Sequence, residues 1–406
     1  MTQPQSIIVH RQYVTTDDAP AIQAAINYVA TAGGIVQLQA GAYNISQPLI
    51  LPRTGPLPTT AVQIIGAGEY ATNLHGLPGF PANRGLIEWA PGAGNLYASY
   101  GQKISGLTFW LPNGVPGVKA IWHQAATDAL ASSANVQREW MQLDLENVRI
   151  ECNNTDHEVL IDLGIGCRFS RWTNVVADPW AGPAPKFDTL LVRTPTTYTG
   201  FNPAVPIDDA VGFSYCHLSS FYPMLVRGGA CRTIEARAVN TTMEHCVDNG
   251  GRMGTGAIAF HFTNSAQLTL RQIGCECNGS AFIRLDNCIN VQIDNISAGT
   301  PPHGATPAQD SIALHGCRNV KIRGRVALPG GQQFSGFGVH SLVMDAACVD
   351  CRATDYDVAV TAGGTSDQLA AAEISIDPAA MINGCTATGW CYQAWQGFRQ
   401  PYSLGH

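Results

Sequence analysis

The amino-acid sequence predicts an all-β protein built as a parallel β-helix, a solenoid of short strands with a helix capping its N-terminal end. An internal repeat is the first observation behind this prediction. Three segments align without a gap, namely FHFTNSAQLTL (260–270), IRLDNCINVQI (283–293) and IALHGCRNVKI (312–322). Each holds two runs of alternating apolar and polar residues joined by a polar corner, the pattern of two strands and a turn. Their starts lie 23 and then 29 residues apart, which is too short for βαβ units and suits coils of a solenoid.

Composition is the second observation. Only 13% of the residues are charged, 45% are hydrophobic, and the chain holds 42 glycines and 24 prolines, as expected of a turn-rich β protein. Because solenoids grow by adding coils, we expect residues 1–406 to form a single domain. The net charge is −7 and there are just four lysines, so no basic stripe exists to bind a phosphate backbone. Nucleic acid is therefore not an expected partner.

Residues 15–45 are expected to form the N-terminal cap. Asp17 or Asp18 can cap a helix that has Pro20 in its first turn, and apolar residues then recur at helical spacing up to Val29. A pair of glycines ends this helix, and two short strands follow around a glycine turn. A helix at this place would cover the open strand edge of the first coil.

Three N-terminal segments carry a more specific resemblance. DDAPAIQAAI (17–26), GGIVQLQAGAYNIS (33–46) and VQIIGAG (62–68) resemble the N-terminal signature of the pectate-lyase-like right-handed β-helix superfamily. That superfamily includes phage tailspike depolymerases, polygalacturonase-like hydrolases, polysaccharide lyases and fructan-converting transferases. The resemblance implies a right-handed coil, a polysaccharide or oligosaccharide substrate and a homotrimer. It implies no cofactor, except that Ca²⁺ would be expected if the activity were that of a lyase.

Further coils follow the N-terminal region as short alternating runs, and two longer stretches interrupt them. The stretches 112–138 and 177–209 are expected to project from the coil as loops over a binding face. The C-terminal part, 371–406, ends in the aromatic run GWCYQAWQGFRQPY. We expect it either to cap the last coil or to pack between subunits.

The thirteen cysteines are interpreted as reduced core residues rather than as a disulfide framework. Cys288 and Cys317 share a column of the repeat, and CVDNG (246–250) is aligned with CECNG (275–279) in the same way. A lone CxxC motif without a second pair nearby is insufficient to predict a metal site.

The repeat also selects residues that point away from the core. If the phenylalanines of the FHFT run face inward, alternation turns His261 outward, and Arg284, Asp286 and His315 face outward on the next two coils. We expect His261, Arg284 and His315 to bind substrate on this face. The alternative is a solvated polar face with incidental ion pairs.

The segment NTTMEHCVDNGGRMGTG (240–256) lies just upstream and is interpreted as the wall of a cleft, or alternatively as a bulge with charges at its tip. His245 and Arg252 are its candidates for substrate binding. Carboxylates in one column would lie about 5 Å apart on adjacent rungs and about 9.6 Å apart two rungs on, close to the separations in retaining and inverting glycosidases. The candidate acid, base or nucleophile residues are Glu244, Asp248, Glu276 and Asp286.

The predicted function is therefore cleavage of glycosidic bonds in a polysaccharide by carboxylate acid/base catalysis. β-Elimination on a uronic-acid polymer, intramolecular fructosyl transfer and glycan binding without catalysis, as in a spike protein, stay open as alternatives. The N-terminus has no basic segment followed by an apolar run, and no span of about eighteen apolar residues predicts a membrane helix. We expect synthesis in a cytoplasm, followed by release or attachment to a virion.

Overall fold

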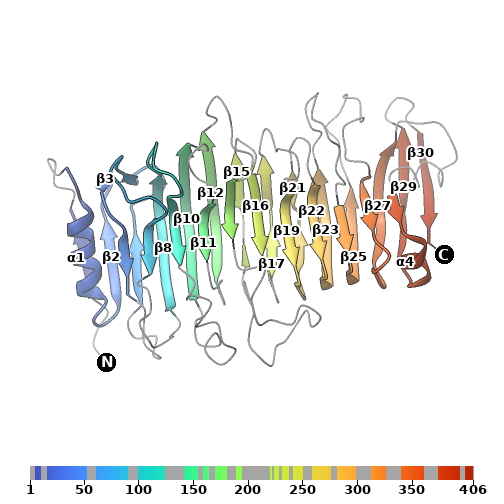
Figure 1. Ribbon diagram of the computed structural model, residues 1–406, viewed down its shortest axis with the longest axis horizontal. Coiled ribbons are helices and arrows are strands. Elements are labelled where there is room, and N and C mark those ends of the chain that lie inside the picture. The colour runs from blue at the N-terminus through green and yellow to red at the C-terminus, as the bar shows by residue number, and fades with distance from the viewer. Residues whose placement is uncertain are drawn as a thin grey trace.

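The chain folds into an elongated stack of coils in the computed structural model, with helix α1 (Ala19–Val29) at one end and strand β30 (Phe398–Leu404) at the other (Figure 1). Successive coils lie side by side and pair through parallel strands, which makes the fold the right-handed parallel β-helix expected from the sequence. The structure describes residues 5–10, 16–52, 61–89, 99–123, 141–153, 159–163, 170–180, 189–193, 220–221, 224–227, 231–236, 241–249, 258–275, 281–298, 312–325, 340–360, 374–393 and 398–405.

Each coil has three faces. One face is sheet B, which is formed by β4 (Leu49–Leu51), β7 (Gly85–Trp89), β9 (Lys119–His123), β11 (Val159–Leu163), β13 (Thr189–Arg193), β16 (Cys231–Ala236), β19 (Ile258–Thr263), β22 (Ala281–Asp286), β24 (Ile312–His315), β26 (Leu342–Met344) and β28 (Ile374–Ile376). The other two faces belong to sheet A, which bends at a corner. The strands of its first face are β1 (Gln5–Val9), β2 (Gly34–Leu38), β5 (Val62–Ile65), β14 (Ser220–Phe221), β17 (Thr242–Glu244) and β20 (Thr269–Arg271).

The strands of the second face of sheet A are β3 (Gly41–Ile45), β6 (Thr72–Gly76), β15 (Met224–Arg227), β18 (Cys246–Asn249) and β21 (Gly274–Cys275). Several longer strands run along both faces and bend at the corner between them: β8 (Ser99–Trp110), β10 (Met141–Asn153), β12 (Arg171–Trp180), β23 (Ile289–Ala298), β25 (Arg318–Arg325), β27 (Arg352–Val360) and β29 (Thr386–Gln393). A closed coil of three faces leaves a narrow interior that is filled mainly by apolar side chains, with a few buried polar ones such as Gln102 and Ser265.

The strand register confirms the columns that the repeat predicts. Phe260 pairs with Ile283 and Ile283 with Ile312, while Val291 pairs with Val320 one face further on. All five side chains are buried, and they stack from coil to coil at the strand spacing of about 4.8 Å. Like residues therefore form continuous apolar rows along the axis, which stabilise neighbouring coils against one another.

Asparagines make the tight corners between faces. Asn147 and Asn174 have φ of 53° and 52° at the corner of sheet A, and the Asn174 amide donates to Oδ1 of Asn147 at 3.0 Å. At the corner after sheet B, Asn319 donates to Asn290 at 2.7 Å, again with both residues left-handed. Asparagine tolerates this conformation better than most residues, so the polar corner of the repeat becomes a ladder of amides.

The cysteines whose side chains the structure describes are free and buried, in agreement with the interpretation from the sequence: Cys152, Cys288, Cys317, Cys348, Cys351 and Cys385. Cys288, Cys317 and Cys348 occupy one column, and their thiols donate to backbone carbonyls of the preceding coil. The alignment of CVDNG with CECNG is wrong, because the register pairs Asp248 with Cys275 and thereby shifts the second segment by two residues. Within the described ranges, no group of three or more His, Cys, Asp or Glu is arranged to hold a metal ion.

Helix α1 packs Ile22, Ile26 and Val29 into the core. Asp18 is the N-cap residue, but its carboxylate accepts from the backbone N–H of Asn44 in β3, while Asp17 accepts from the N–H of Ala19. The two aspartates thus share the tasks of capping the helix and fixing it to the first coil. None of the helices in the described part of the chain is long and apolar enough to cross a membrane.

The last coil ends differently from the first. The short helix α4 (Pro378–Ile382) follows β28, and Asp377 caps it by accepting from the N–H of Ala379 at 2.8 Å. β30 then pairs antiparallel with β29 and covers an edge that would otherwise be open (Figure 1).

Candidate functional site

Two columns of mostly polar residues are aligned by the strand register of sheet B. The first, called the stripe below, consists of Glu88, Trp122, Asp162, Arg193, Glu235, His261 and Arg284. The second column lies two residues further along each strand: Thr263, Asp286 and His315 are paired, and Asp345 and Asp377 directly follow the last paired residues of β26 and β28. The pairings of His261 with Arg284 and of Asp286 with His315 are those predicted from alternation alone.

Asp286 links the two columns. Nε2 of His261 lies 2.7 Å from Oδ2 of Asp286, and Nε of Arg284 donates to both carboxylate oxygens at 3.0 Å. The side chains of His261 and Asp286 are only 15% and 19% exposed, whereas that of Arg284 is 41% exposed. The Asp286 carboxylate is therefore fixed by two side chains of sheet B, His261 and Arg284, and the Arg284 guanidinium is still accessible to solvent.

The charge state of Asp286 follows from these contacts. Burial by itself would raise the pKa of this carboxyl, but the hydrogen bonds from His261 and Arg284, together with their positive charge, outweigh burial and lower the pKa below 3.8. Asp286 is thus ionised at neutral pH. It suits the role of a base, a nucleophile or an anionic anchor, and it does not suit that of a general acid.

His315 has a partner that the repeat did not reveal. Its Nδ1 lies 3.4 Å from Oδ2 of Asp345, which stands on the next coil. The other oxygen of Asp345 accepts from the backbone N–H groups of Gly316 and Ala347 at 2.9 and 3.1 Å. The carboxylate thus anchors the corner of one coil while it contacts the imidazole of the coil before it.

Asp345 is also ionised at neutral pH. Burial would raise its pKa, but the Gly316 and Ala347 N–H groups, the Cys348 thiol and the charge of His315 lower it overall. Sequence reasoning missed this residue because LVMD (342–345) matches IALH (312–315) only at the apolar positions. The signal that could have found it is the spacing, since Leu342 follows Ile312 by nearly the same interval as Ile312 follows Ile283.

Asp286, His315 and Asp345 stand on three successive rungs. Their backbones are spaced at about 4.8 Å per rung, so the two aspartates are separated by about 9.6 Å with an imidazole between them. Asp286 and His315, on adjacent rungs, are about 4.8 Å apart at the backbone.

The stripe continues from His261 toward the N-terminal end of sheet B. Asp162 and Glu88 are 6% and 4% exposed, although their column faces outward. Arg84 donates to Glu88 at 2.6 to 3.1 Å, and the Lys119 ammonium lies 5.0 Å from the centre of the Trp122 ring. At this end of the stripe the two described carboxylates are therefore covered, and Glu88 is paired with Arg84.

Glu244 and His245 lie outside this face. Glu244 is on β17 of sheet A and forms an exposed ion pair with Arg271 at 3.1 Å. His245 is the left-handed corner residue between β17 and β18, with φ of 53°, and is exposed. The interpretation of this segment as a wall beside the His261 face is wrong for residues 241–249, because they form two regular strands on the other faces of the coil.

Asp248 lies on β18, again in sheet A, so the structure does not place Glu244, Asp248 and Asp286 in one column. Glu276 and Arg252 lie outside the described residues. Of the three predicted carboxylates within the described ranges, Asp286 is the one on sheet B.

Comparison with known proteins finds no matching protein-family model and no matching curated protein. Solved structures do resemble the chain. ORF18 of Geobacillus virus E2 matches at 11% identity with a TM-score of 0.47, over 93% of this chain and 58% of that one. Tailspike protein 2 of the Escherichia coli O157:H7 bacteriophage CAB120 matches at 12% identity with a TM-score of 0.46, over 92% and 45%.

The catalytic unit of a GH87 α-1,3-glucanase from Streptomyces thermodiastaticus matches at 12% identity with a TM-score of 0.49, over 93% of this chain and 66% of that one. The chain thus spans 45 to 66% of the length of these three structures. All three are right-handed β-helices, and each likeness is one of fold alone.

Proposed function

We propose that the chain is a polysaccharide-active enzyme that cleaves glycosidic bonds on the outer face of sheet B. The observation that carries this proposal is the column Asp286, His315 and Asp345, in which two ionised carboxylates flank an imidazole on successive coils. A flat parallel sheet repeats such groups at intervals close to the length of a sugar residue, so a chain of sugars can lie along the coils.

Asp286 is assigned the role of the base that activates water, or of the nucleophile. A base must be ionised before it accepts a proton, and the His261 and Arg284 contacts keep Asp286 in that state. The same contacts hold the carboxylate in one orientation, which lowers the entropy cost of reaching the reacting geometry.

His315 is assigned the role of proton donor to the leaving group. Its Nδ1 faces Asp345, which leaves Nε2 as the nitrogen that exchanges a proton with a substrate. Its side chain is 37% exposed, so a substrate on the sheet can reach it. Asp345 is then a positioning residue, because it orients the ring and is itself bound to two backbone N–H groups.

The substrate is proposed to be neutral. In the second column the described side chains are the carboxylates of Asp286, Asp345 and Asp377 beside Thr263 and His315, and an acidic face repels a polyuronate. The described contacts supply carboxylates, imidazoles and the exposed Arg284, all of which bind sugar hydroxyls without requiring a charged substrate.

β-Elimination is the second candidate, and Arg284 is the observation that favours it. Its guanidinium is 41% exposed and would neutralise the carboxylate of a uronate, as elimination requires. Under this alternative Ca²⁺ would be the expected cofactor. The homotrimer and the release from the cell or attachment to a virion, suggested by the sequence resemblance, stay predictions.

A panel of neutral polysaccharides and polyuronates tests the proposal, with the wild type and Asp286→Asn incubated side by side. We expect new reducing ends from a neutral polymer, no ultraviolet absorbance of an unsaturated product, and a loss of activity in the variant. Reducing ends together with that absorbance would support elimination instead. Glycan binding by the wild type without either signal would support the non-catalytic spike protein.

A further inference from the structure

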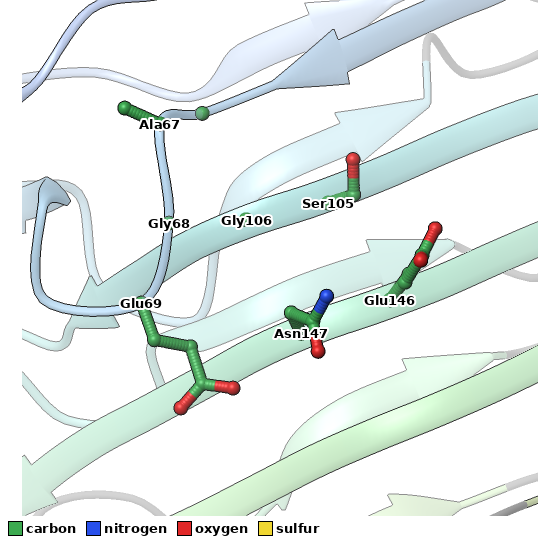
Figure 2. A pocket seen from close by; sticks show the side chains of 8 residues that line it. Ala67, Gly68, Glu69, Ser105, Gly106, Glu146 and Asn147 are labelled. Atoms are coloured by element: carbon green, nitrogen blue, oxygen red, sulfur yellow. The ribbon is translucent and has the colours of Figure 1, made fainter.

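A pocket lies on the other side of the coil, at the corner of sheet A. It has a volume of about 450 Å³ and is lined by Gly66, Ala67, Gly68, Glu69, Ser105, Gly106, Glu146 and Asn147. Figure 2 shows that Ser105 and Gly106 come from β8 and Glu146 and Asn147 from β10, while Glu69 hangs from the loop that passes over them. This volume falls in the range of about 300–1,000 Å³ that is usual for sites of small ligands.

The loop that carries Glu69 reaches across three coils. The N–H of Tyr70 donates to Thr108 at 2.9 Å on β8, the Tyr70 hydroxyl donates to Glu151 at 3.2 Å on β10, and Asn174 on β12 donates to Glu69 at 2.7 Å. Such contacts between distant parts of the chain hold the loop as a fixed wall.

Glycines allow the loop to lie so close to the coil. The N–H groups of Gly66 and Gly68 donate to the carbonyls of Ser105 and Gly106, both at 2.8 Å. A Cβ atom on Gly66 would lie 2.2 Å from the carbonyl oxygen of Gly106, a separation that no side chain tolerates. The GAG sequence at 66–68 therefore has a structural reason and builds one side of the pocket.

The walls of the pocket carry carboxylates in different surroundings. Glu146 pairs with Lys103 at 2.5 Å. Glu69 is partly desolvated, which raises its pKa despite the charge of Arg149 and the hydrogen bond from Asn174. The pocket thus offers one paired carboxylate, one carboxyl with a raised pKa, and the amide of Asn147.

An exposed aromatic residue follows Glu69 directly in the loop. Tyr70 is 55% exposed, although its hydroxyl is hydrogen-bonded and the Arg149 guanidinium lies 4.8 Å from its ring centre. On the same face, one rung from Glu151, Trp110 stacks on His75 with ring centroids 5.5 Å apart. Rings held in this way are the surfaces on which the apolar face of a sugar packs.

We propose that this corner pocket is a second binding site of the chain, for a neutral or amino sugar, separate from the columns of sheet B. The carboxylates and the amide accept and donate hydrogen bonds to sugar hydroxyls, while Tyr70 contacts the ring. An acidic sugar is disfavoured, because it would meet two glutamates. The proposal rests on the proposed function in taking a sugar as the ligand, but it does not require cleavage.

Saturation-transfer NMR with glucose, galactose, glucosamine and glucuronate tests this site, using the wild type, Tyr70→Ala, Glu69→Ala and Asp286→Asn. We expect transfer to at least one of the first three sugars and none to glucuronate. Tyr70→Ala or Glu69→Ala should weaken binding by about tenfold, corresponding to 1.4 kcal/mol, while Asp286→Asn should leave it unchanged. Tyr28→Ala is the matched control, because Tyr28 is 56% exposed on α1.

Circular dichroism and thermal unfolding would establish that each variant folds. The proposal is overturned if none of the three sugars receives saturation, if glucuronate alone binds, or if Tyr70→Ala and Glu69→Ala bind as the wild type does. Loss of binding in Asp286→Asn alone would show that the sugar binds to sheet B and not to the corner pocket. If the cleavage assay fails but sugar binding still depends on Tyr70, the proposed function is rejected. The sugar site at the corner of sheet A is then supported on its own.

Discussion

Nε2 of His261 lies 2.7 Å from Oδ2 of Asp286, a contact between neighbouring coils that joins the two polar columns of sheet B. The pair is partly buried, and Arg284 completes it from the strand of Asp286. Nδ1 of His261 is buried and has no hydrogen-bond partner among the described residues. His261 is therefore oriented by its contact with Asp286, which makes the pair a test of whether this face is organised for chemistry.

Removal of the Asp286 charge should change the acid stability of the protein. The folded-state pKa of Asp286 lies below the ordinary value of 3.8, so its contribution to stability is complete above pH 3.8 and is lost as pH falls through the folded-state pKa. Asp286→Asn lacks this contribution at neutral pH. Thermal unfolding from pH 7 to pH 2 should show a difference between wild type and variant that shrinks at acid pH; a constant difference would contradict the assignment.

Asp345 should contribute to both folding and activity. Asp345→Ala removes the acceptor of the Gly316 and Ala347 N–H groups, and we expect a loss of about 1–2 kcal/mol of unfolding free energy, as for other lost caps. Asp345→Asn keeps an acceptor and should restore most of that stability.

The activity of the two Asp345 variants separates its roles. If Asp345 positions His315 through its charge, Asp345→Asn should fold normally but show a lower kcat and an altered pH profile. An Asp345→Asn enzyme with the kcat and pH profile of the wild type would reduce Asp345 to a structural residue.

Gly66 should not tolerate a side chain. In Gly66→Ala, the new Cβ would overlap the Gly106 carbonyl oxygen, so we expect a loss of about 1–3 kcal/mol or more in denaturant unfolding. Gly79→Ala is the control, because a Cβ there meets nothing within 4 Å. Equal stability of the two variants would show that the loop can move away from β8 at no cost.

The stacked thiols should be unreactive in the folded protein. Hydrogen bonding with Cys288 and burial raise the pKa of Cys317, and hydrogen bonding with Cys351 and burial raise that of Cys348, so neither forms a thiolate at neutral pH. Alkylation with iodoacetamide followed by peptide mass spectrometry should label both only after unfolding. Labelling of either in the native protein would contradict the stacked-core interpretation.

The product stereochemistry distinguishes the two roles assigned to Asp286. His315, the assigned acid, stands on the adjacent rung at about 4.8 Å, which is close to the separation of about 5–5.5 Å in retaining glycosidases, so we expect Asp286 to act as the nucleophile. Proton NMR of the first product formed should show the same anomer as that of the substrate. Inversion would show instead that Asp286 activates a water molecule.

The repeat made the core and the columns of sheet B predictable, because stacked coils force like residues into one register. Phe260, Ile283 and Ile312 could be aligned from apolar alternation alone, and their outward neighbours followed. Corners were harder to predict, since a single left-handed residue such as His245 turns the chain onto a new face without a glycine or proline to mark it.

Contacts between distant segments were not predictable at all. The hydrogen bond between Glu69 and Asn174 spans 105 residues and depends on how far a loop extends across the coils. The sequence repeat carries no information on how far this loop extends, so the corner pocket could not be predicted from the sequence. Asp345 was partly predictable. The apolar residues of its rung follow the repeat, but the polar residues no longer resemble those of the three aligned segments.

The rate of glycosidic cleavage in Asp286→Asn, measured beside Glu244→Gln on the same polysaccharide, tests the central claim most directly. Glu244 is a carboxylate of sheet A in an exposed ion pair, and its variant should keep the wild-type rate. Asp286→Asn should lose about 10²–10⁴-fold in kcat, as expected for removal of a base. A wild-type rate in Asp286→Asn, or a comparable loss in Glu244→Gln, would contradict the assignment of the active site to the outer face of sheet B.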